Sequence, residues 1–177
     1  ELHAPHVAPL TAFVEELRAH GWVIGQNAAI EYRWGGGGAG SLGDLAAELI
    51  RLQMDVIFAA STPAALATQK TGTKIPVVFA AVSEPIETGL VAGLARPGGN
   101  ITGLTTLNRE LMPKRLELLK EAVPGLARVG YLANPANPVP QPQLKEMRAA
   151  AQSLGMDLHL FEVRDALQPM GKLDLLE

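Results

Sequence analysis

The sequence contains no cysteine, which excludes disulfide bonds, thiolate metal sites and cysteine nucleophiles. Aromatic residues make up only 5% of the chain. No apolar run approaches the roughly 18 residues that a membrane-spanning helix needs. Neither sign of charge dominates, since 15 Lys and Arg stand against 18 Asp and Glu, and there is no basic run. We therefore expect no nucleic-acid binding through phosphate contacts.

The four histidines are also of little use as metal ligands. They are scattered along the chain, and only His3 and His6 have the spacing of a ligand pair, at the terminus. We therefore expect no metal site and no cofactor.

Hydrophobic residues, in contrast, make up 47% of the chain, enough for a substantial core. Amphipathic and apolar stretches alternate along the sequence, which predicts helices and strands in turn. The predicted helices cover residues 8–20, 42–52, 86–94, 111–123 and 143–154, with one more after residue 62. The predicted strands cover residues 27–34, 55–60, 75–82, 101–106, 128–133 and 156–163. Such alternation is typical of an α/β fold with parallel sheets and right-handed crossovers.

A domain boundary is expected near residues 106–110, where one β/α unit is complete and the next begins. We predict an N-terminal lobe over residues 1–107 and the beginning of a second lobe over residues 108–177. The apolar stripe of the first predicted helix needs a sheet to pack against, but no strand precedes that helix in the sequence. The first lobe is therefore expected to lack its first strand.

Short polar residues follow two of the predicted strands. The apolar run at residues 55–60 is typical of a strand that is covered on both faces. Thr62 then follows as a predicted helix N-cap, with Pro63 as the first helical residue. The strand at residues 75–82 ends in Ser83. Ligands of open α/β sheets bind at the carboxyl ends of the strands, so we predict the functional site at this edge.

This edge is suited to an anion. The N–H groups of Ala64 and Ala65 have no partner within the predicted helix, and the Ser61 and Thr62 hydroxyls add donors. The helix dipole would favour a carboxylate there. In the competing interpretation Thr62 only caps the helix. Ser61 and Ser83 are poor candidates for nucleophiles, because neither lies in a G-x-S-x-G motif and no histidine is near in sequence.

Two other motifs have competing interpretations. Residues 35–40 satisfy G-x-G-x-x-G, but the strand before them alternates like an exposed edge strand and Asp55 begins the next strand. These features favour a flexible loop over a dinucleotide site, and a P-loop is excluded because no G-K-[ST] is present. Residues 134–138 follow a predicted strand of the second lobe. They form either an Asx-type turn or a loop that presents Asn134 to a ligand, and both interpretations stay open.

An ordered set of segments resembles a known family. It includes Gly21-Trp22-Val23, Ile30-Glu31-Tyr32-Arg33-Trp34, Thr62-Pro63-Ala64-Ala65, Leu94-Ala95-Arg96-Pro97-Gly98-Gly99-Asn100-Ile101-Thr102-Gly103, Lys114-Arg115-Leu116-Glu117-Leu118-Leu119-Lys120 and Asn134-Pro135. From about Phe13 to Arg164 the chain resembles ABC-transporter substrate-binding proteins of the tryptophan/tyrosine-binding type. Family members are nearly twice as long and open with a strand that is absent here. A truncated member is therefore expected, with most of lobe one and the start of lobe two.

The resemblance implies a type I periplasmic-binding-protein fold, whose Rossmann-like, doubly wound lobes close on a small ligand. It further implies a non-enzymatic importer component outside the cytoplasm, often periplasmic, which binds an amino acid, possibly aromatic, and docks on a membrane ABC permease. A homodimer, or a strand exchanged between copies, would fill the place of the missing strand. By loop position, the resemblance places ligand-binding residues at Ser61, Thr62, Ala64, Val82, Ser83, Thr105, Thr106 and Asn134. It implies no catalytic residues.

Two alternatives belong to other functional classes. A sensor or regulator could use the same fold, but the fused DNA-binding or signalling segment that would favour it is not present in the sequence. An α/β enzyme would need an acid–base pair, and Glu84 is the only acidic residue in the two ligand loops of the first lobe.

Overall fold

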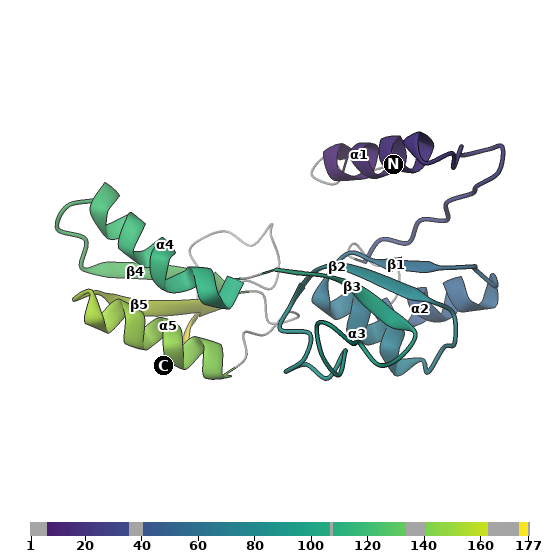
Figure 1. Ribbon diagram of the computed structural model, residues 1–177. Coiled ribbons are helices and arrows are strands. Elements are labelled where there is room, and N and C mark those ends of the chain that lie inside the picture. The colour runs from purple at the N-terminus through teal and green to yellow at the C-terminus, as the bar shows by residue number, and fades with distance from the viewer. Residues whose placement is uncertain (1–6, 36–40, 107, 134–140, 163–173, 177) are drawn as a thin grey trace. The chain divides into compact units, whose positions relative to one another are not determined.

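The computed structural model describes residues 7–35, 41–106, 108–133, 141–162 and 174–176 (Figure 1). By contacts, the chain divides into two compact units, Glu1–Gly40 and Ser41–Glu177. In chain order the elements are α1 (Val7–Ala19), α2 (Leu42–Arg51), β1 (Ile57–Ala59), α3 (Thr62–Lys70), β2 (Val77–Ser83), β3 (Ile101–Thr106), α4 (Asn108–Ala122), β4 (Arg128–Ala133), α5 (Gln141–Ser153), β5 (Asp157–Glu162) and β6 (Asp174–Leu176). Within the described ranges, no helix is both long and apolar enough to cross a membrane.

The described part of the first unit, residues 7–35, consists of α1, a set of turns and a segment without regular secondary structure. Gly21 follows the helix with a φ of +87°, and the Asn27 side chain amide donates to its carbonyl at 2.9 Å. The strand predicted at residues 27–34 is wrong, because the described part of this unit holds a single β-bridge, between Ile24 and Ala28. Alternation alone does not make a strand, since a strand also needs a neighbour to accept its hydrogen bonds.

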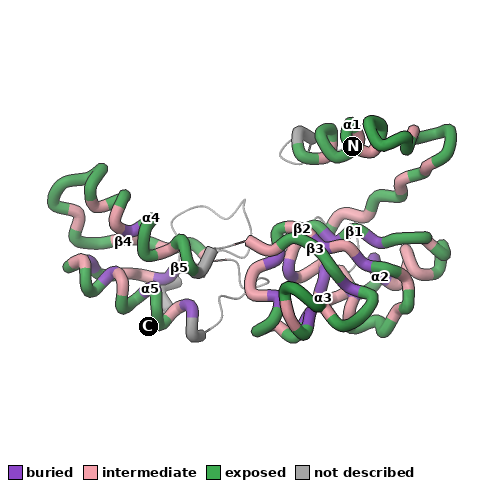
Figure 2. Tube along the Cα trace, viewed as in Figure 1, coloured by how far each residue is buried: buried purple, intermediate pink, exposed green. Residues whose placement is uncertain are grey.

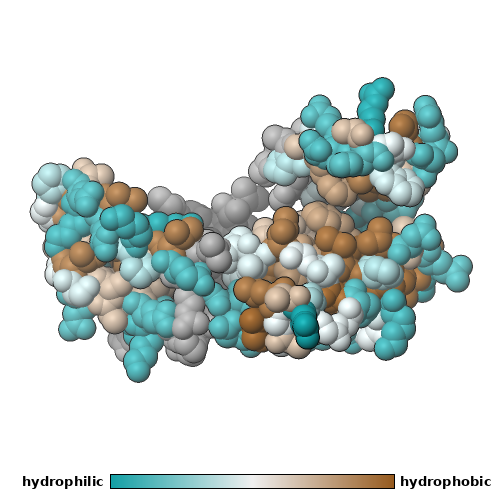
Figure 3. Space-filling view, in the orientation of Figure 1, coloured by the Kyte–Doolittle hydropathy of each residue, from teal (hydrophilic) through white to brown (hydrophobic). Residues whose placement is uncertain are grey.

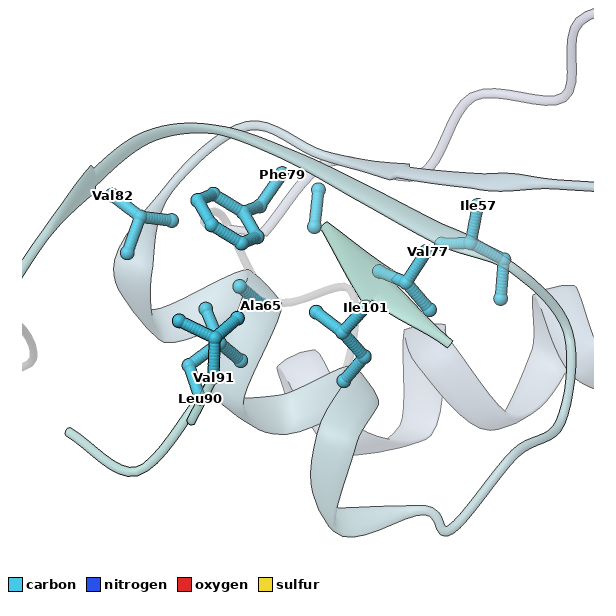
Figure 4. Close-up of a cluster of buried hydrophobic side chains, with 9 residues drawn as sticks. Ile57, Ala65, Val77, Phe79, Val82, Leu90, Val91 and Ile101 are labelled. Atoms are coloured by element: carbon cyan, nitrogen blue, oxygen red, sulfur yellow. The ribbon is translucent and has the colours of Figure 1, made fainter. Parts of the chain in front are cut away.

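The second unit contains a first sheet of three parallel strands in the order β1-β2-β3. Helix α3 packs against β1 and β2, and α2 packs against α3. Most buried hydrophobic residues of this part lie on the three strands, on α3 and on the turns after β2 (Figure 2). They form one hydrophobic cluster, drawn in Figure 4: Ile57, Ala59, Ala65, Val77, Phe79, Val82, Leu90, Val91 and Ile101. Burial of these apolar side chains is the main force that holds the sheet and its helices together.

The other face of this sheet is more exposed. Val56 and Phe58 keep 53% and 47% of their surface, and Leu104 keeps 75%. Hydrophobic residues accordingly gather on the surface over this sheet in Figure 3. Within this unit, α2 and α3 both pack on the face that carries the hydrophobic cluster.

A bulge interrupts the pairing of β2 with β3. The register shifts between Phe79 and Val82, and Ala81 takes a φ of +54°. Gly103 lies opposite Phe79, where an added Cβ would come within 2.0 Å of the Phe79 carbonyl oxygen. Glycine is therefore required at position 103 for the two strands to approach each other.

The second sheet pairs β4 with β5 in parallel and β5 with β6 in antiparallel orientation. Helices α4 and α5 pack together on it, over a small core of Leu116, Ala151 and Met156. The Lys120 ammonium donates a hydrogen bond to the Leu154 carbonyl just beyond the end of α5, where backbone acceptors lack helical partners.

Most predicted elements are found within three residues of their expected bounds. The helix predicted at residues 86–94 is wrong, because turns replace it, with the Leu90 N–H donating to the Pro85 carbonyl at 2.9 Å.

Candidate functional site

Three elements of the first sheet meet at its carboxyl edge: the start of α3, the end of β2 and the end of β3. The Ser83 N–H donates to the Thr62 hydroxyl oxygen at 3.0 Å. The Ser83 hydroxyl shares a hydrogen bond with the Thr106 hydroxyl, also at 3.0 Å. Residues more than 20 positions apart are thereby joined by side-chain hydroxyls into one polar edge.

The cap of α3 differs from the prediction. Ser61, not Thr62, is the N-cap, and its hydroxyl accepts from the Ala64 N–H at 3.3 Å. Thr62 is instead the first helical residue, and Pro63 the second. The physical reason is that the Thr62 hydroxyl is engaged with Ser83, so it does not turn back onto its own helix.

The N–H groups that were expected to receive an anion have partners within the chain. The Ala64 N–H donates to the Ser61 hydroxyl, and the Ala65 N–H donates to the Ser61 carbonyl at 3.0 Å. An anion at Ala64 would therefore have to displace Ser61. The side chains that the structure brings to this edge are mainly hydroxyls, which both donate and accept hydrogen bonds.

The third part of the edge is the Val82 carbonyl, at the bulge of β2. It accepts a hydrogen bond from the Thr105 hydroxyl at 2.9 Å and a longer one, at 3.4 Å, from the Thr106 hydroxyl. Beyond Ser83, Glu84 takes a φ of +50° and is half-buried. The loop that follows β2 is thus held by side chains of β3 and flanked by unusual backbone conformations.

The structure brings seven of the eight predicted site residues to this edge: Ser61, Thr62, Ala64, Val82, Ser83, Thr105 and Thr106. The eighth, Asn134, lies outside the described residues, as does the glycine-rich loop at residues 36–40. Sequence reasoning missed the bulge that shapes the edge. A signal for it was present, because an isolated glycine inside a strand pattern, here Gly103, indicates a bulge or a close approach of backbones.

A shallow depression of about 300 Å³ lies at the opposite, amino end of the same sheet. There the Gln69 amide donates to the Gly89 carbonyl at 2.7 Å. The Asn100 amide donates to the Thr73 and Ile75 carbonyls at 3.0 and 2.7 Å. These amides tie loops together, so the Pro97-Gly98-Gly99-Asn100 motif has a structural role at that end. Across the described residues, no group of three potential metal ligands is found.

Comparison with known proteins identifies the family. A model of the family described as ABC transporter substrate binding protein matches residues 4–168. This chain belongs to that family. Its members are substrate-binding proteins rather than enzymes.

Known relatives of the ABC transporter substrate-binding family support this assignment. A tyrosine-binding protein of Clostridioides difficile is 28% identical over 171 residues, which cover 93% of this chain and 49% of the relative. A conserved domain protein of Vibrio cholerae superimposes with a TM-score of 0.77 and 29% identity, over 86% of this chain and 51% of the other. An ABC domain from Streptococcus pneumonia in complex with L-Trp gives a TM-score of 0.71 and 25% identity, over 85% and 50%.

These matches confirm the predicted α/β fold with parallel sheets of the periplasmic-binding-protein type. The chain spans about half the length of the relatives that it matches, in agreement with the expectation of a truncated member.

Proposed function

We propose that this chain acts as the solute-binding component of an ABC importer and that its ligand is an amino acid with an aromatic side chain. Family membership supports the first part, and the second follows from relatives whose names state tyrosine binding or a complex with L-Trp. The observation that carries the proposal is the hydroxyl-lined carboxyl edge of the first sheet, where three elements converge.

In this proposal the lobes are residues 1–107 and residues 108–177, and the ligand contacts come from both. The first lobe would contribute the loops that carry Ser61, Thr62, Ala64, Val82, Ser83, Thr105 and Thr106, and the second lobe would contribute Asn134. Hydroxyls suit the two charged ends of an amino acid, because they can donate to the carboxylate and accept from the ammonium group. Closure of the lobes about a hinge would then bury the ligand, as in other two-lobed binding proteins.

The proposed partner is the membrane permease of the same importer, and the proposed location is outside the cytoplasm. The family assignment supports both. A homodimer or an exchanged strand has no support in the comparisons and is not part of the proposal.

The test is a thermal shift assay of the full chain against the twenty amino acids, with nucleosides and sugars as comparison ligands. At about a hundredfold excess over Kd, a ligand that binds only the folded state stabilises it by roughly 2.7 kcal/mol. We expect the midpoint to rise by several degrees with one or a few amino acids, foremost tryptophan or tyrosine. A response to nucleosides or sugars alone would overturn the ligand class, and no response to any ligand would overturn the binding function.

Ser83→Ala locates the site within this test. We expect the variant to weaken binding of the responding amino acid about tenfold, the size of one lost hydrogen bond to a charged group. Ser153→Ala is the matched control, because the Ser153 hydroxyl is exposed on α5 and donates only to the Ala150 carbonyl at 2.8 Å in its own helix. Equal affinities of the two variants would contradict the proposed position of the site.

A further inference from the structure

We infer that Thr62 is a positioning residue, whose hydroxyl holds the peptide between Val82 and Ser83 in the orientation that ligand binding requires. The effect on ligand binding rests on the proposed function, whereas the hydrogen bond between Thr62 and Ser83 does not depend on it. Thr62 keeps only 6% of its surface, whereas Ser83 is half-buried at the edge. A nearly buried hydroxyl that already accepts a hydrogen bond is better placed to act through its neighbour than on a ligand.

Both polar groups of this one peptide are held by threonine hydroxyls. The N–H, on Ser83, donates to Thr62 Oγ1 at 3.0 Å, and the C=O, on Val82, accepts from Thr105 Oγ1 at 2.9 Å. Thr62 belongs to α3 and Thr105 to β3, so the peptide is clamped between two different elements. Rotation of the peptide plane would break both hydrogen bonds. We call Thr62, Thr105 and the peptide between them the peptide clamp.

The backbone on both sides explains why a clamp is needed. Ala81 has a φ of +54° and Glu84 a φ of +50°, a region that residues with a Cβ rarely adopt. The regular ladder between β2 and β3 is interrupted between Phe79 and Val82 and resumes in a shifted register, with Val82 opposite Thr105 and Ser83 opposite Thr106. The clamp thus lies where the pairing resumes, between two strained residues, and holds this segment in place.

The consequence concerns the direction of the Ser83 side chain. With the peptide held, the Ser83 hydroxyl lies 3.0 Å from the Thr106 hydroxyl, at the edge where the ligand is proposed to bind. A released peptide would let Ser83 turn away from this position. Thr62 would then affect affinity without touching the ligand, in contrast to the direct contact that was predicted from sequence.

The decisive variants are Thr62→Val, Thr62→Ser and Thr68→Val. Valine keeps the branched shape of threonine and removes the hydroxyl, and serine restores the hydroxyl. Thr68 is the matched control on the same helix, because it keeps 3% of its surface and its hydroxyl donates to the Ala64 carbonyl at 2.9 Å. The measurements are amide hydrogen exchange at Ser83 in the ligand-free full chain and calorimetric affinity for L-tryptophan and L-tyrosine.

We expect Thr62→Val to speed exchange of the Ser83 amide about tenfold and to weaken amino-acid binding by a similar factor. Thr62→Ser and Thr68→Val should leave both values near those of the unmodified protein. Unchanged exchange in Thr62→Val would overturn the clamp, and if affinity alone fell, Thr62 would be a ligand contact. Faster exchange with unchanged affinity would overturn the link between the clamp and binding.

Two further results keep the inference separate from the proposed function. If the unmodified protein bound neither amino acid, the ligand class would fail, while the exchange measurement would still decide the clamp. If Thr62→Val did not fold, Thr105→Val would release the same peptide from its carbonyl side. We expect that variant to speed Ser83 exchange as well, and unchanged exchange would overturn the clamp.

Discussion

The two sheets of this protein follow the same plan but differ in how their cores are built. Each has a parallel strand pair with two helices packed on it. In the first sheet, buried residues from β1, β2, β3, α3 and the turn after β2 join in one cluster. In the second, Leu116, Ala151 and Met156 are buried among neighbours that are only half-buried, such as Val129 and Leu158. Among the described residues, the same plan thus gives a cluster of nine buried side chains on the first sheet and a cluster of three on the second.

Side chains also hold helix ends on both sheets. Ser41 and Ser61 cap the N-termini of α2 and α3, and Lys120 bonds to the backbone just beyond the C-terminal end of α5. N-terminal caps place ordered backbone near the carboxyl ends of the parallel strands, because the strand–helix loops lie there. In the first sheet, side-chain hydrogen bonds thus fix the edge proposed to bind the ligand.

The largest loss of stability is expected from Gly103→Ala, which would disrupt the pairing of β2 with β3 at the bulge. The added methyl would lie 2.0 Å from the Phe79 carbonyl oxygen, so β2 and β3 must move apart. We expect a loss of about 3 kcal/mol or more in the free energy of unfolding, measured by urea denaturation. Gly99→Ala is the control, because nothing lies within 4 Å of its added Cβ. Equal losses in the two variants would contradict this account of the bulge.

A matched pair of core truncations would compare the two sheets directly. Leu90 and Leu116 both keep 4% of their surface, one in the first core and one in the second. We expect both Leu→Ala changes to cost about 2–5 kcal/mol, with Leu90→Ala the costlier. The half-buried neighbours of Leu116 can relax into the space, whereas the buried neighbours of Leu90 cannot. Amide exchange in β2 and β4 would measure the loss of stability in each sheet. A larger loss in Leu116→Ala than in Leu90→Ala would contradict the expected order.

The smallest expected effect is the contribution of the N-terminal cap of α2 to the pH dependence of stability. The Ser41 hydroxyl and then its backbone N–H donate to the Asp44 carboxylate, at 2.8 and 3.1 Å, and lower the pKa of Asp44 from its usual 3.8. A lowered folded-state pKa stabilises the fold above the unfolded pKa, and this contribution is lost as the pH falls through the folded value. We therefore expect wild-type protein to lose more stability than Asp44→Asn between pH 5 and pH 3.

Urea midpoints at the two pH values would measure this difference. Ser41→Ala keeps the carboxylate but removes the hydroxyl that lowers its pKa, so this variant should show less acid sensitivity than wild type as well. Identical pH dependence in all three proteins would rule out the cap as its source.

Much of the fold could be predicted from local patterns. The helix at Leu42–Arg51 and the strand at Arg128–Ala133 agree with their predicted ranges, because apolar spacing reflects which face of each element is buried. The family assignment from ordered motifs is confirmed. Two predictions failed although the local pattern was adequate. Residues 27–34 alternate like a strand, but among the described residues no neighbouring strand pairs with them. Residues 86–94 form turns instead of the predicted helix.

The sequence by itself determined the element types, the parallel α/β class and the hydroxyl-rich loops at one edge of the first sheet. Only the tertiary structure decided which hydroxyl bonds to which partner. Thr62 could have capped its own helix, but its hydroxyl lies next to Ser83, 21 positions away, and Ser61 became the cap. Local spacing cannot show such a choice, because it depends on the bulge of β2 and on the close approach of Gly103 to Phe79, which bring distant backbone groups within hydrogen-bonding distance.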